Sequence, residues 1–477
     1  MPHSLIETDT SLEAIAIHPV GPEGLDDLLG ELPAPAAQFA RAQGFKAKKG
    51  EIALLPDERG GLAQVLFGLG PAGKRDPLLA GLLPTRLPAG LYRFNGAGRR
   101  DVLAWLMGAY RFRRYRGGKA GKGNDRGNGD ADDRQVRLLA PDGVDVAQVV
   151  QIADALALGR DLINTPANDC GPAEIAQAVE RLAQRHGASC QIIEGDALIA
   201  ENLPMIHAVG RASPRAPRLI DLRWGRADAP RVTLVGKGVA FDTGGLNIKP
   251  DNAMSLMKKD MGGAAAAIAA AAMVMASGLD LRLRLLVPAV ENAISGNAFR
   301  PGDVLPSRKG LNVEIGNTDA EGRLILADAL ALADEEEPDL MIDFATLTGS
   351  ARVALGPDLP PFMTDDEALA GDLVRIGEAE ADPVWRLPLW QPYDDLLRSS
   401  VADLNHISGN SFAGAIVAGL FLRRFVEKAK SYVHFDIYGW VPNAKPARPK
   451  GGEAQAARLV HALLSERYPS RSNGGGK

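Results

Sequence analysis

The chain changes from strand to helix within VEIGNTDAEGRLILADALALA, residues 313–333. Val313 and Ile315 alternate with polar residues, as in a strand, and the apolar spacing after the turn is that of a helix. Asp319 and Glu321 therefore fall in the connection between strand and helix. Two carboxylates so close together repel each other unless a cation lies between them. The alternative is that acidic residues simply favour the dipole of the helix N-terminus.

A second candidate segment is VGKGVAFDTGGLNIKPD, residues 235–251. Lys237 lies inside an apolar strand, where a lysine is costly unless it is paired or coordinated. Asp242 follows the strand, a flexible glycine pair lets the backbone approach a ligand, and Lys249 comes next. A phosphate loop is excluded because the spacing GxxxxGK[ST] is absent. Taken alone, Lys237 can also be interpreted as a solvated surface lysine.

The third segment is MKKDMGGAA, residues 257–265. Asp260 directly precedes a predicted helix that begins at Gly262. An isolated aspartate in this position is more often a helix N-cap than a ligand. The two roles are compatible, because a capping carboxylate keeps a second oxygen free.

Together the three segments bring four acids, Asp242, Asp260, Asp319 and Glu321, to the carboxyl ends of predicted strands, where ligand crevices open. Such a cluster suits two divalent cations bridged by oxygen ligands about 3.5–4 Å apart. The seven histidines show no HExxH or other ligand spacing. The predicted metal site is therefore rich in oxygen ligands, and Zn²⁺, Mn²⁺ and Mg²⁺ are all chemically allowed.

The bulk properties are those of a globular protein. A chain of 477 residues favours two domains. The net charge of −5 gives no general attraction to nucleic acid or anionic membranes. Two cysteines, Cys170 and Cys190, exclude a disulfide framework and favour a reducing compartment. The N-terminal residues do not form a secretory signal, and the small-residue run at 262–278 is expected to be a buried helix, so a cytoplasmic location is predicted.

Apolar runs alternating with helical patterns predict an α/β fold of two domains. We expect a smaller N-terminal α/β domain at residues 1–150 and a C-terminal domain at residues 151–470, with a mixed, largely parallel sheet flanked by helices. Candidate strands in the second domain are 217–224, 231–241, 281–290, 340–347 and 432–439, and candidate helices are 263–277, 322–336 and 413–428. The segment 116–134 is expected to be a flexible loop, and residues 471–477 a disordered tail.

The octapeptide NTDAEGRL, residues 317–324, resembles the signature of the leucyl (cytosol) aminopeptidase family. The resemblance covers roughly residues 155–465 and extends, in the expected order, to these further blocks: RDLINTPAND (160–169), VGKGVAFDTGGLNIK (235–249), MKKDMGGAAA (257–266), DFATLTGSARVALG (343–356) and GAIVAGLFLRRFV (414–426). The N-terminal third resembles the family only loosely. The resemblance implies that residues 151–470 are a catalytic metallo-aminopeptidase domain and residues 1–150 an assembly or regulatory domain.

The family's metal ligands are carried over residue by residue. One metal is expected on Lys237, Asp242, Asp260 and Glu321, and the other on Asp242, Asp319 and Glu321, so that two carboxylates bridge. A lysine that binds a metal is neutral, so the pKa of Lys237 is expected to be depressed by the adjacent cations.

The resemblance also implies the reaction. Lys249 and Arg323 match the two catalytic residues of the family. One metal captures the free α-amine, the pair activates a bridging water, and Lys249 helps to stabilise the oxyanion. Arg323 is expected to hold a bicarbonate that moves the proton, since no histidine or free carboxylate remains as a general base. The family assembles as a homohexamer that restricts its substrates to short peptides.

The pocket for the first side chain is expected to include Met257, Thr346, Leu347 and Gly349, although a methionine beside a helix is more often part of the core. Tyr438 departs from the family, whose members commonly have alanine at this position. A preference for leucine is therefore an expectation that Tyr438 can alter by narrowing the pocket.

Two other classes of function are compatible with parts of the sequence. The basic segment RRYRGGKAGKGNDR, residues 113–126, suggests a nucleic-acid-binding regulator. It turns acidic at Asp130, and the whole chain is acidic, so a solvated loop is favoured and nucleic acid is not an expected partner. A scaffold without activity is disfavoured because every expected ligand and both catalytic positions are present.

Overall fold

The computed structural model describes residues 4–115 and 135–471. The predicted flexible loop at 116–134 and the tail from residue 472 onward lie outside the described residues. The chain forms two compact units. Unit 1 comprises Met1–Ala157 with Asn443–Lys450, and unit 2 comprises Leu158–Pro442 with Gly451–Lys477. The segment Asn443–Lys450 thus groups with unit 1, although the sequence placed it in the second domain.

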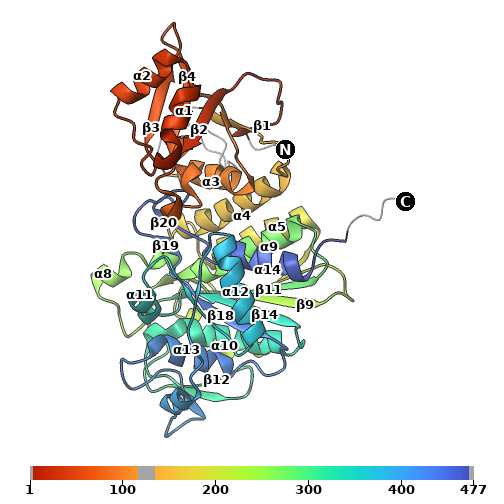
Figure 1. Ribbon diagram of the computed structural model, residues 1–477. Coiled ribbons are helices and arrows are strands. Elements are labelled where there is room, and N and C mark those ends of the chain that lie inside the picture. The colour runs from red at the N-terminus through yellow and green to blue at the C-terminus, as the bar shows by residue number, and fades with distance from the viewer. Residues whose placement is uncertain (1–3, 116–134, 472–477) are drawn as a thin grey trace. The chain divides into compact units, whose positions relative to one another are not determined.

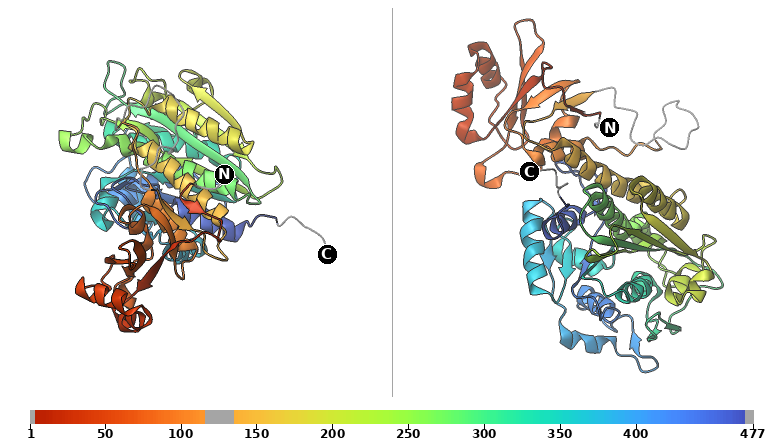
Figure 2. Two further views of the ribbon diagram at one scale, coloured as in Figure 1. Left: turned by 90° about the horizontal axis from the view of Figure 1, so that it is seen from above. Right: turned by 90° about the vertical axis from the view of Figure 1, so that its right-hand side faces the viewer.

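Unit 1 is an α/β unit built on a six-stranded sheet with the order β1-β6-β5-β2-β4-β3. All its strand pairs are parallel except β3 with β4. Figure 2 shows α1 and α2, in red, lying against the sheet, and their apolar residues share a core with β3 and β4. The elements are β1 (Ile6–Glu7), β2 (Ile15–Val20), α1 (Leu25–Glu31), α2 (Ala34–Ala42), β3 (Ile52–Pro56), β4 (Leu62–Gly68), β5 (Gly90–Phe94), α3 (Arg99–Ala109) and β6 (Val136–Leu139).

Unit 2 is built on a nine-stranded sheet with the order β16-β15-β18-β14-β9-β11-β8-β7, and β10 also pairs with β11. Its central pairs, β18–β14, β14–β9, β9–β11 and β10–β11, are parallel. Its strands are β7 (Ser189–Glu194), β8 (Arg218–Trp224), β9 (Arg231–Gly236), β10 (Gly238–Asp242), β11 (Arg282–Asn292), β14 (Leu340–Ala345), β15 (Pro361–Met363), β16 (Trp385–Arg386) and β18 (Tyr432–Asp436). The predicted α/β class with a mixed, largely parallel sheet is confirmed.

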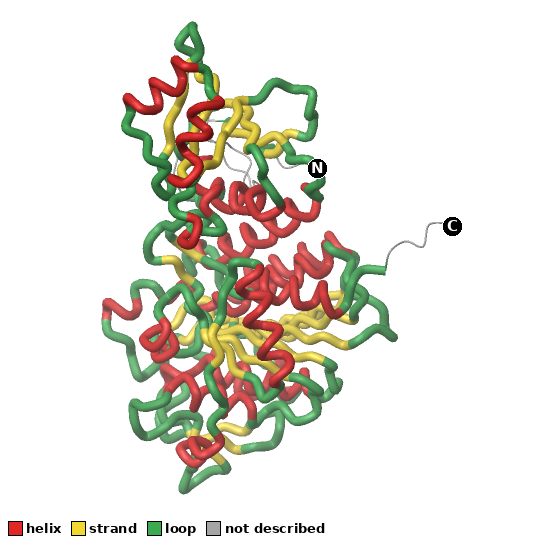
Figure 3. The backbone as a smooth tube through the Cα atoms, in the orientation of Figure 1, coloured by secondary structure: helices red, strands yellow, loops and turns green. Residues whose placement is uncertain are grey.

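Helices cover both faces of the unit 2 sheet, as Figures 1 and 3 show. On one face α9 packs on β9 and β14 beside α5 and α14, and on the other α10 packs on β9 and β11 beside α7 and α13. Helix α4 (Val146–Asn164) begins in unit 1 and ends in unit 2. The helices that lie wholly in unit 2 are α5 (Pro172–His186), α6 (Ala197–Ala200), α7 (Pro204–Gly210), α8 (Asp251–Met254), α9 (Gly262–Ala276), α10 (Glu321–Asp334), α11 (Gly349–Leu355), α12 (Glu367–Ala379), α13 (Gly414–Arg423) and α14 (Ala457–Arg467). Short strands are β12 (Val304–Pro306), β13 (Asn312–Glu314), β17 (Leu404–Asn405), β19 (Trp440–Val441) and β20 (Gly451–Gly452).

The apolar run at 262–278 forms the buried helix that was predicted. Every residue of α9 from Gly262 to Met275 is buried. Among the described residues, one helix, Met257–Ala276, is long and apolar enough to cross a membrane, and 94% of its apolar window lies inside the fold. Small side chains explain this position, because they allow the helix to lie close to the sheet.

Two predicted elements differ from the structure. The expected strand at 231–241 is divided at Lys237, whose N–H donates to the carbonyl of Phe344 while β10 continues with β11 alone. The expected helix at 413–428 ends at Arg423. The backbone N–H groups of residues 427–429 donate instead to the carboxylate of Asp334, at the end of α10. In both cases tertiary hydrogen bonds replace those that local periodicity predicts.

Candidate metal centre

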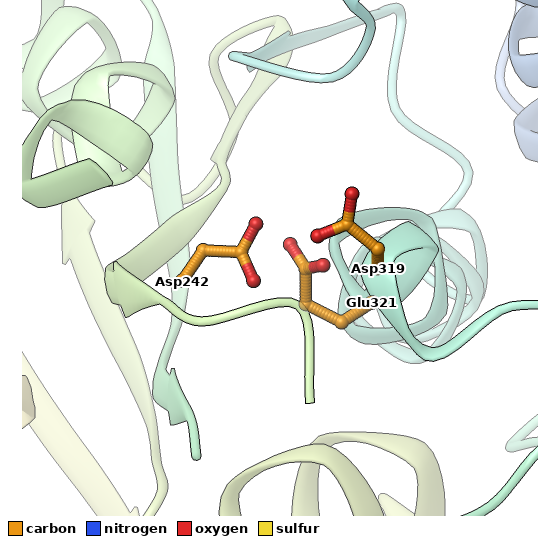
Figure 4. A group of neighbouring side chains, drawn as sticks. All are labelled: Asp242, Asp319 and Glu321. Carbon is orange, nitrogen blue, oxygen red and sulfur yellow. The ribbon is translucent and has the colours of Figure 1, made fainter. Parts of the chain in front are cut away.

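Three carboxylates from distant parts of the sequence converge at the carboxyl end of β10. Asp242 is the last residue of β10, Asp319 lies in the 3₁₀ helix Thr318–Ala320, and Glu321 is the first residue of α10. Figure 4 shows the three side chains pointing toward one another, and one oxygen from each lies within 4.8 Å of the others. Asp242 and Glu321 are buried, and Asp319 is partly buried. Such a spacing allows a cation to be shared between the groups.

Two lysines lie between these carboxylates and a fourth acid. The Nζ of Lys237 is 2.7 Å from Asp260 Oδ2 and 3.0 Å from Glu321 Oε1. The Nζ of Lys249 is 2.7 Å from Asp242 Oδ2 and 2.6 Å from Asp319 Oδ1. The two ammonium groups thus link the four acids in two pairs, and the short spacing of the three carboxylates joins the pairs into one cluster. The structure brings together all five predicted metal-binding residues and Lys249.

Two glycines make room for this cluster. Gly244 has φ of +87°, and a Cβ there would lie 2.8 Å from Asp319 Oδ1. At the start of α10, a Cβ on Gly322 would lie 2.4 Å from Cε of Lys237. Lys237 therefore reaches Glu321 only because the next residue has no side chain.

The charges of the cluster perturb one another strongly. Burial and the nearby Asp260 raise the pKa of Asp242, and burial and Asp242 raise the pKa of Glu321. Burial disfavours the ammonium of Lys237, but Asp260 and Glu321 outweigh it, so its pKa lies above the ordinary value. The expected depression of this pKa requires adjacent cations and concerns the metal-bound form. Buried acids that resist ionisation beside one another fit a site for divalent cations.

The alternative role of Asp260 as a helix N-cap is wrong. Asp260 lies in a 3₁₀ helix, Met257–Met261, and the N-cap of α9 is Met261 without a side-chain hydrogen bond. Instead, Asp260 Oδ1 accepts a hydrogen bond of 2.8 Å from Thr346 Oγ1, while Oδ2 faces Lys237. Both oxygens of Asp260 are therefore directed toward the cluster.

Arg323 lies two residues after Glu321 in α10 and is buried, with 8% of its surface exposed. Its Nη1 donates to the carbonyl of His406 at 2.6 Å. Its Nε is buried and has no hydrogen-bond partner among the described residues. Burial lowers the pKa of Arg323 to about 10, which still leaves it charged at neutral pH. A buried guanidinium with a free N–H is suited to an anion.

The residues expected to contact substrate divide into two groups. Thr346 belongs to the cluster, because its carbonyl accepts from Lys237 Nζ and its hydroxyl donates to Asp260. Leu347 follows it, and its N–H donates to Asp436. Met257 begins the 3₁₀ helix that carries Asp260, and Gly349 is exposed at the start of α11. No hydrogen bond of the described residues links Met257 or Gly349 to the acids.

Asn292, at the end of β11, was not predicted from the sequence. Its side chain is 1% exposed, and its Nδ2 lies 2.9 Å from Asp242 Oδ1, 3.0 Å from the carbonyl of Thr318 and 3.4 Å from Glu321 Oε2. It therefore holds together the two carboxylates that come from β10 and α10. The sequence feature that could have indicated Asn292 is its position as a polar residue at the carboxyl end of an apolar strand.

The sequence does not reveal a second buried network. Asp343 of β14 accepts hydrogen bonds of 2.7 Å from Tyr432 and from Nδ1 of His434, both on β18. Further along β18, Asp436 accepts from the N–H groups of Leu347 and Thr348. These contacts fix the segment that carries Thr346. They depend on the parallel register of β14 and β18, which the sequence alone does not reveal.

Known proteins share sequence similarity with both units. Residues 157–463 match the cytosol aminopeptidase family, catalytic domain, and residues 15–122 match the M17 aminopeptidase N-terminal domain. The fold and the acidic cluster are thus those of a metal-dependent exopeptidase, a hydrolase. More specifically, the chain belongs to the cytosol aminopeptidase family.

Individual relatives agree with this assignment. A probable cytosol aminopeptidase of Stenotrophomonas maltophilia is 41% identical over 370 residues, which are 77% of this chain and 72% of that protein. The crystal structure of a cytosol aminopeptidase from Coxiella burnetii is 44% identical and covers 98% of this chain and 100% of its own, with a TM-score of 0.91. The bottromycin maturation enzyme BotP in complex with Mn is 32% identical and covers 94% and 99%, with a TM-score of 0.82.

The position of Asn292 leads to a prediction about metal affinity. Asn292→Ala removes the donor that orients Asp242 and Glu321, so the affinity for Mn²⁺ or Zn²⁺ is expected to fall about 10- to 100-fold. Competition with a fluorescent chelator measures this change. Asn297→Ala, at an exposed position in the following loop, is the matched control and should bind as the unmodified protein does. Equal affinities in the two variants would contradict the role of Asn292.

Proposed function

We propose that the protein removes N-terminal residues, with a leucine-like preference, from short peptides by means of two divalent cations. The observation that carries the proposal is the buried cluster in which Lys237 and Lys249 link Asp242, Asp260, Asp319 and Glu321. Membership of the cytosol aminopeptidase family supports the reaction class.

The proposed ligand sets share two carboxylates. One cation would be held by Lys237, Asp242, Asp260 and Glu321, and the other by Asp242, Asp319 and Glu321. The donors suit Zn²⁺ or Mn²⁺, and the Mn complex of BotP supports manganese for a related chain. When bound, the two cations would supply Lewis acidity and lower the pKa of a water molecule.

Side chains of this protein would stabilise the developing charge, assist proton transfer and bind the first residue of the substrate. Lys249 would donate to the carbonyl oxygen of the scissile bond as negative charge develops there, because its ammonium already lies between Asp242 and Asp319. Arg323 would hold a bicarbonate through its buried Nε, and the bound anion would supply a group capable of proton transfer. Met257, Thr346, Leu347 and Gly349 would surround the first side chain.

The first test is hydrolysis of leucine-p-nitroanilide by the purified protein, stripped of metal and then titrated with Mn²⁺ or Zn²⁺. Activity is expected to return with the metal and to be absent in Glu321→Ala, which loses a bridging ligand. Glu335→Ala, at a half-exposed residue just beyond the same helix, is the control and should remain active. Bound metal without hydrolysis of any aminoacyl-anilide or dipeptide would contradict the proposal.

The ligand sets predict how many metal ions each variant retains. The unmodified protein should bind two ions per chain. Asp260→Ala and Asp319→Ala should each retain one, because each carboxylate serves a single ion, whereas Asp242→Ala should bind none tightly. Native mass spectrometry counts the ions. If Asp260→Ala and Asp319→Ala both retained two ions, these ligand sets would be ruled out.

Assembly as a homohexamer and a cytoplasmic location are also proposed. They rest on resemblance to the family, whose name places its members in the cytosol. Sedimentation velocity is expected to give one species near six times the chain mass of 50.5 kDa. A monomer or dimer at micromolar concentration would contradict the assembly.

A further inference from the structure

Tyr438 lies next to the segment that carries the metal-binding Asp260. Its backbone N–H and that of Gly439 both donate to Oε1 of Gln455, at 3.0 and 2.9 Å, which fixes the turn after β18. A Cβ on Gly439 would lie 3.1 Å from the methyl group of Thr346. Thr346 in turn binds Asp260. Tyr438 therefore stands beside the residues proposed to surround the first side chain of the substrate.

Two cations lie against the ring of Tyr438. The Nζ of Lys259 is 4.8 Å from the ring centroid, and the guanidinium carbon of Arg352 is 5.0 Å from it. Lys259 is only 6% exposed, whereas Arg352 is exposed on α11. Within the described residues, neither side chain forms an ion pair or a hydrogen bond. A lysine this deeply buried is normally paired with an acid, so its lack of one is unusual.

The acids nearby are already engaged. Asp260 faces Lys237 and Thr346. Asp436 accepts from the N–H groups of Leu347 and Thr348 through Oδ1 and from the Thr348 hydroxyl through Oδ2. The hydrogen-bonding capacity of Lys259 and Arg352 thus remains available to a group from outside the chain.

A hollow beside the ring is lined by Thr348, Arg352, Asp436 and Tyr438, among others, and has a volume of about 10 Å³. That space is close to what one water-sized group requires. One oxygen of a carboxylate fits these dimensions.

We propose that Lys259, Arg352 and Tyr438 form a cationic end to the pocket for the first side chain, so that the protein also cleaves peptides beginning with aspartate or glutamate. The inference rests on the proposed function and deepens it. The acidic side chain reaches past Thr346 and receives charge-assisted hydrogen bonds from the two cations. The ring of Tyr438 holds both cations in place and limits the depth of the pocket.

The test compares substrates that differ only in charge. Asp-Ala and Asn-Ala have side chains of nearly equal size, so the ratio of their kcat/KM values isolates the effect of the carboxylate. The metal-loaded protein is expected to favour Asp-Ala about tenfold, as one charge-assisted hydrogen bond allows. In a neutral pocket, Asn-Ala would have the higher kcat/KM of the two dipeptides. Glu-Ala and Leu-Ala complete the panel.

Variants identify the residues responsible. Arg352→Gln, at an exposed position that should fold normally, and Lys259→Gln are each expected to lower the Asp-to-Asn ratio at least threefold. Tyr438→Phe keeps the ring and should keep the ratio, whereas Tyr438→Ala should lower it. Arg398→Gln, an exposed arginine paired with Asp395, is the matched control and should leave the ratio unchanged.

The outcomes separate the two proposals. Cleavage of Leu-Ala with Asp-Ala no better than Asn-Ala overturns the cationic pocket and leaves the aminopeptidase function intact. A high ratio that neither Arg352→Gln nor Lys259→Gln lowers also overturns it. Failure to cleave any of the four dipeptides overturns both.

Discussion

Four carboxylates and two ammonium groups share one buried space in unit 2, and much of the local structure serves to hold them there. Placing charges in the interior is costly unless each one meets an opposite charge or a hydrogen-bond donor. The formal balance of four acids and two lysines is −2, which favours the binding of additional positive charge. The break between β9 and β10, the two glycines and Asn292 are all understandable as parts that bring these groups within 3 Å of one another.

Much of this centre could be predicted from the sequence because its members lie in short segments with a strong local pattern. Asp319 and Glu321 stand in a strand-to-helix connection, and Lys237 interrupts an apolar run. Asn292 was missed because a single amide after a strand has no distinctive spacing. Its importance depends on β10 lying beside β11, which is a matter of sheet order.

The fold class followed from apolar runs and helical periodicity, whereas element ends depended on tertiary contacts. Asp334 accepts backbone N–H groups after α13 and so ends a helix that its own sequence would extend. Asp260 has the position of a helix cap by sequence, yet its oxygens turn to Thr346 and Lys237. Competing partners far away in the chain decided both cases, and periodicity carries no information about them.

The centre is assembled from segments between residues 237 and 321, joined by a sheet whose strands are not consecutive in sequence. An unfolded chain cannot present these donors together, so a divalent cation binds the native state far better than the denatured ensemble. Metal availability thus becomes a determinant of conformational stability. Every tenfold rise of free metal above the dissociation constant of a bound ion adds about 1.4 kcal/mol to the free energy of unfolding. A cell that starves this protein of metal therefore deprives it of stability as well as of its cofactor.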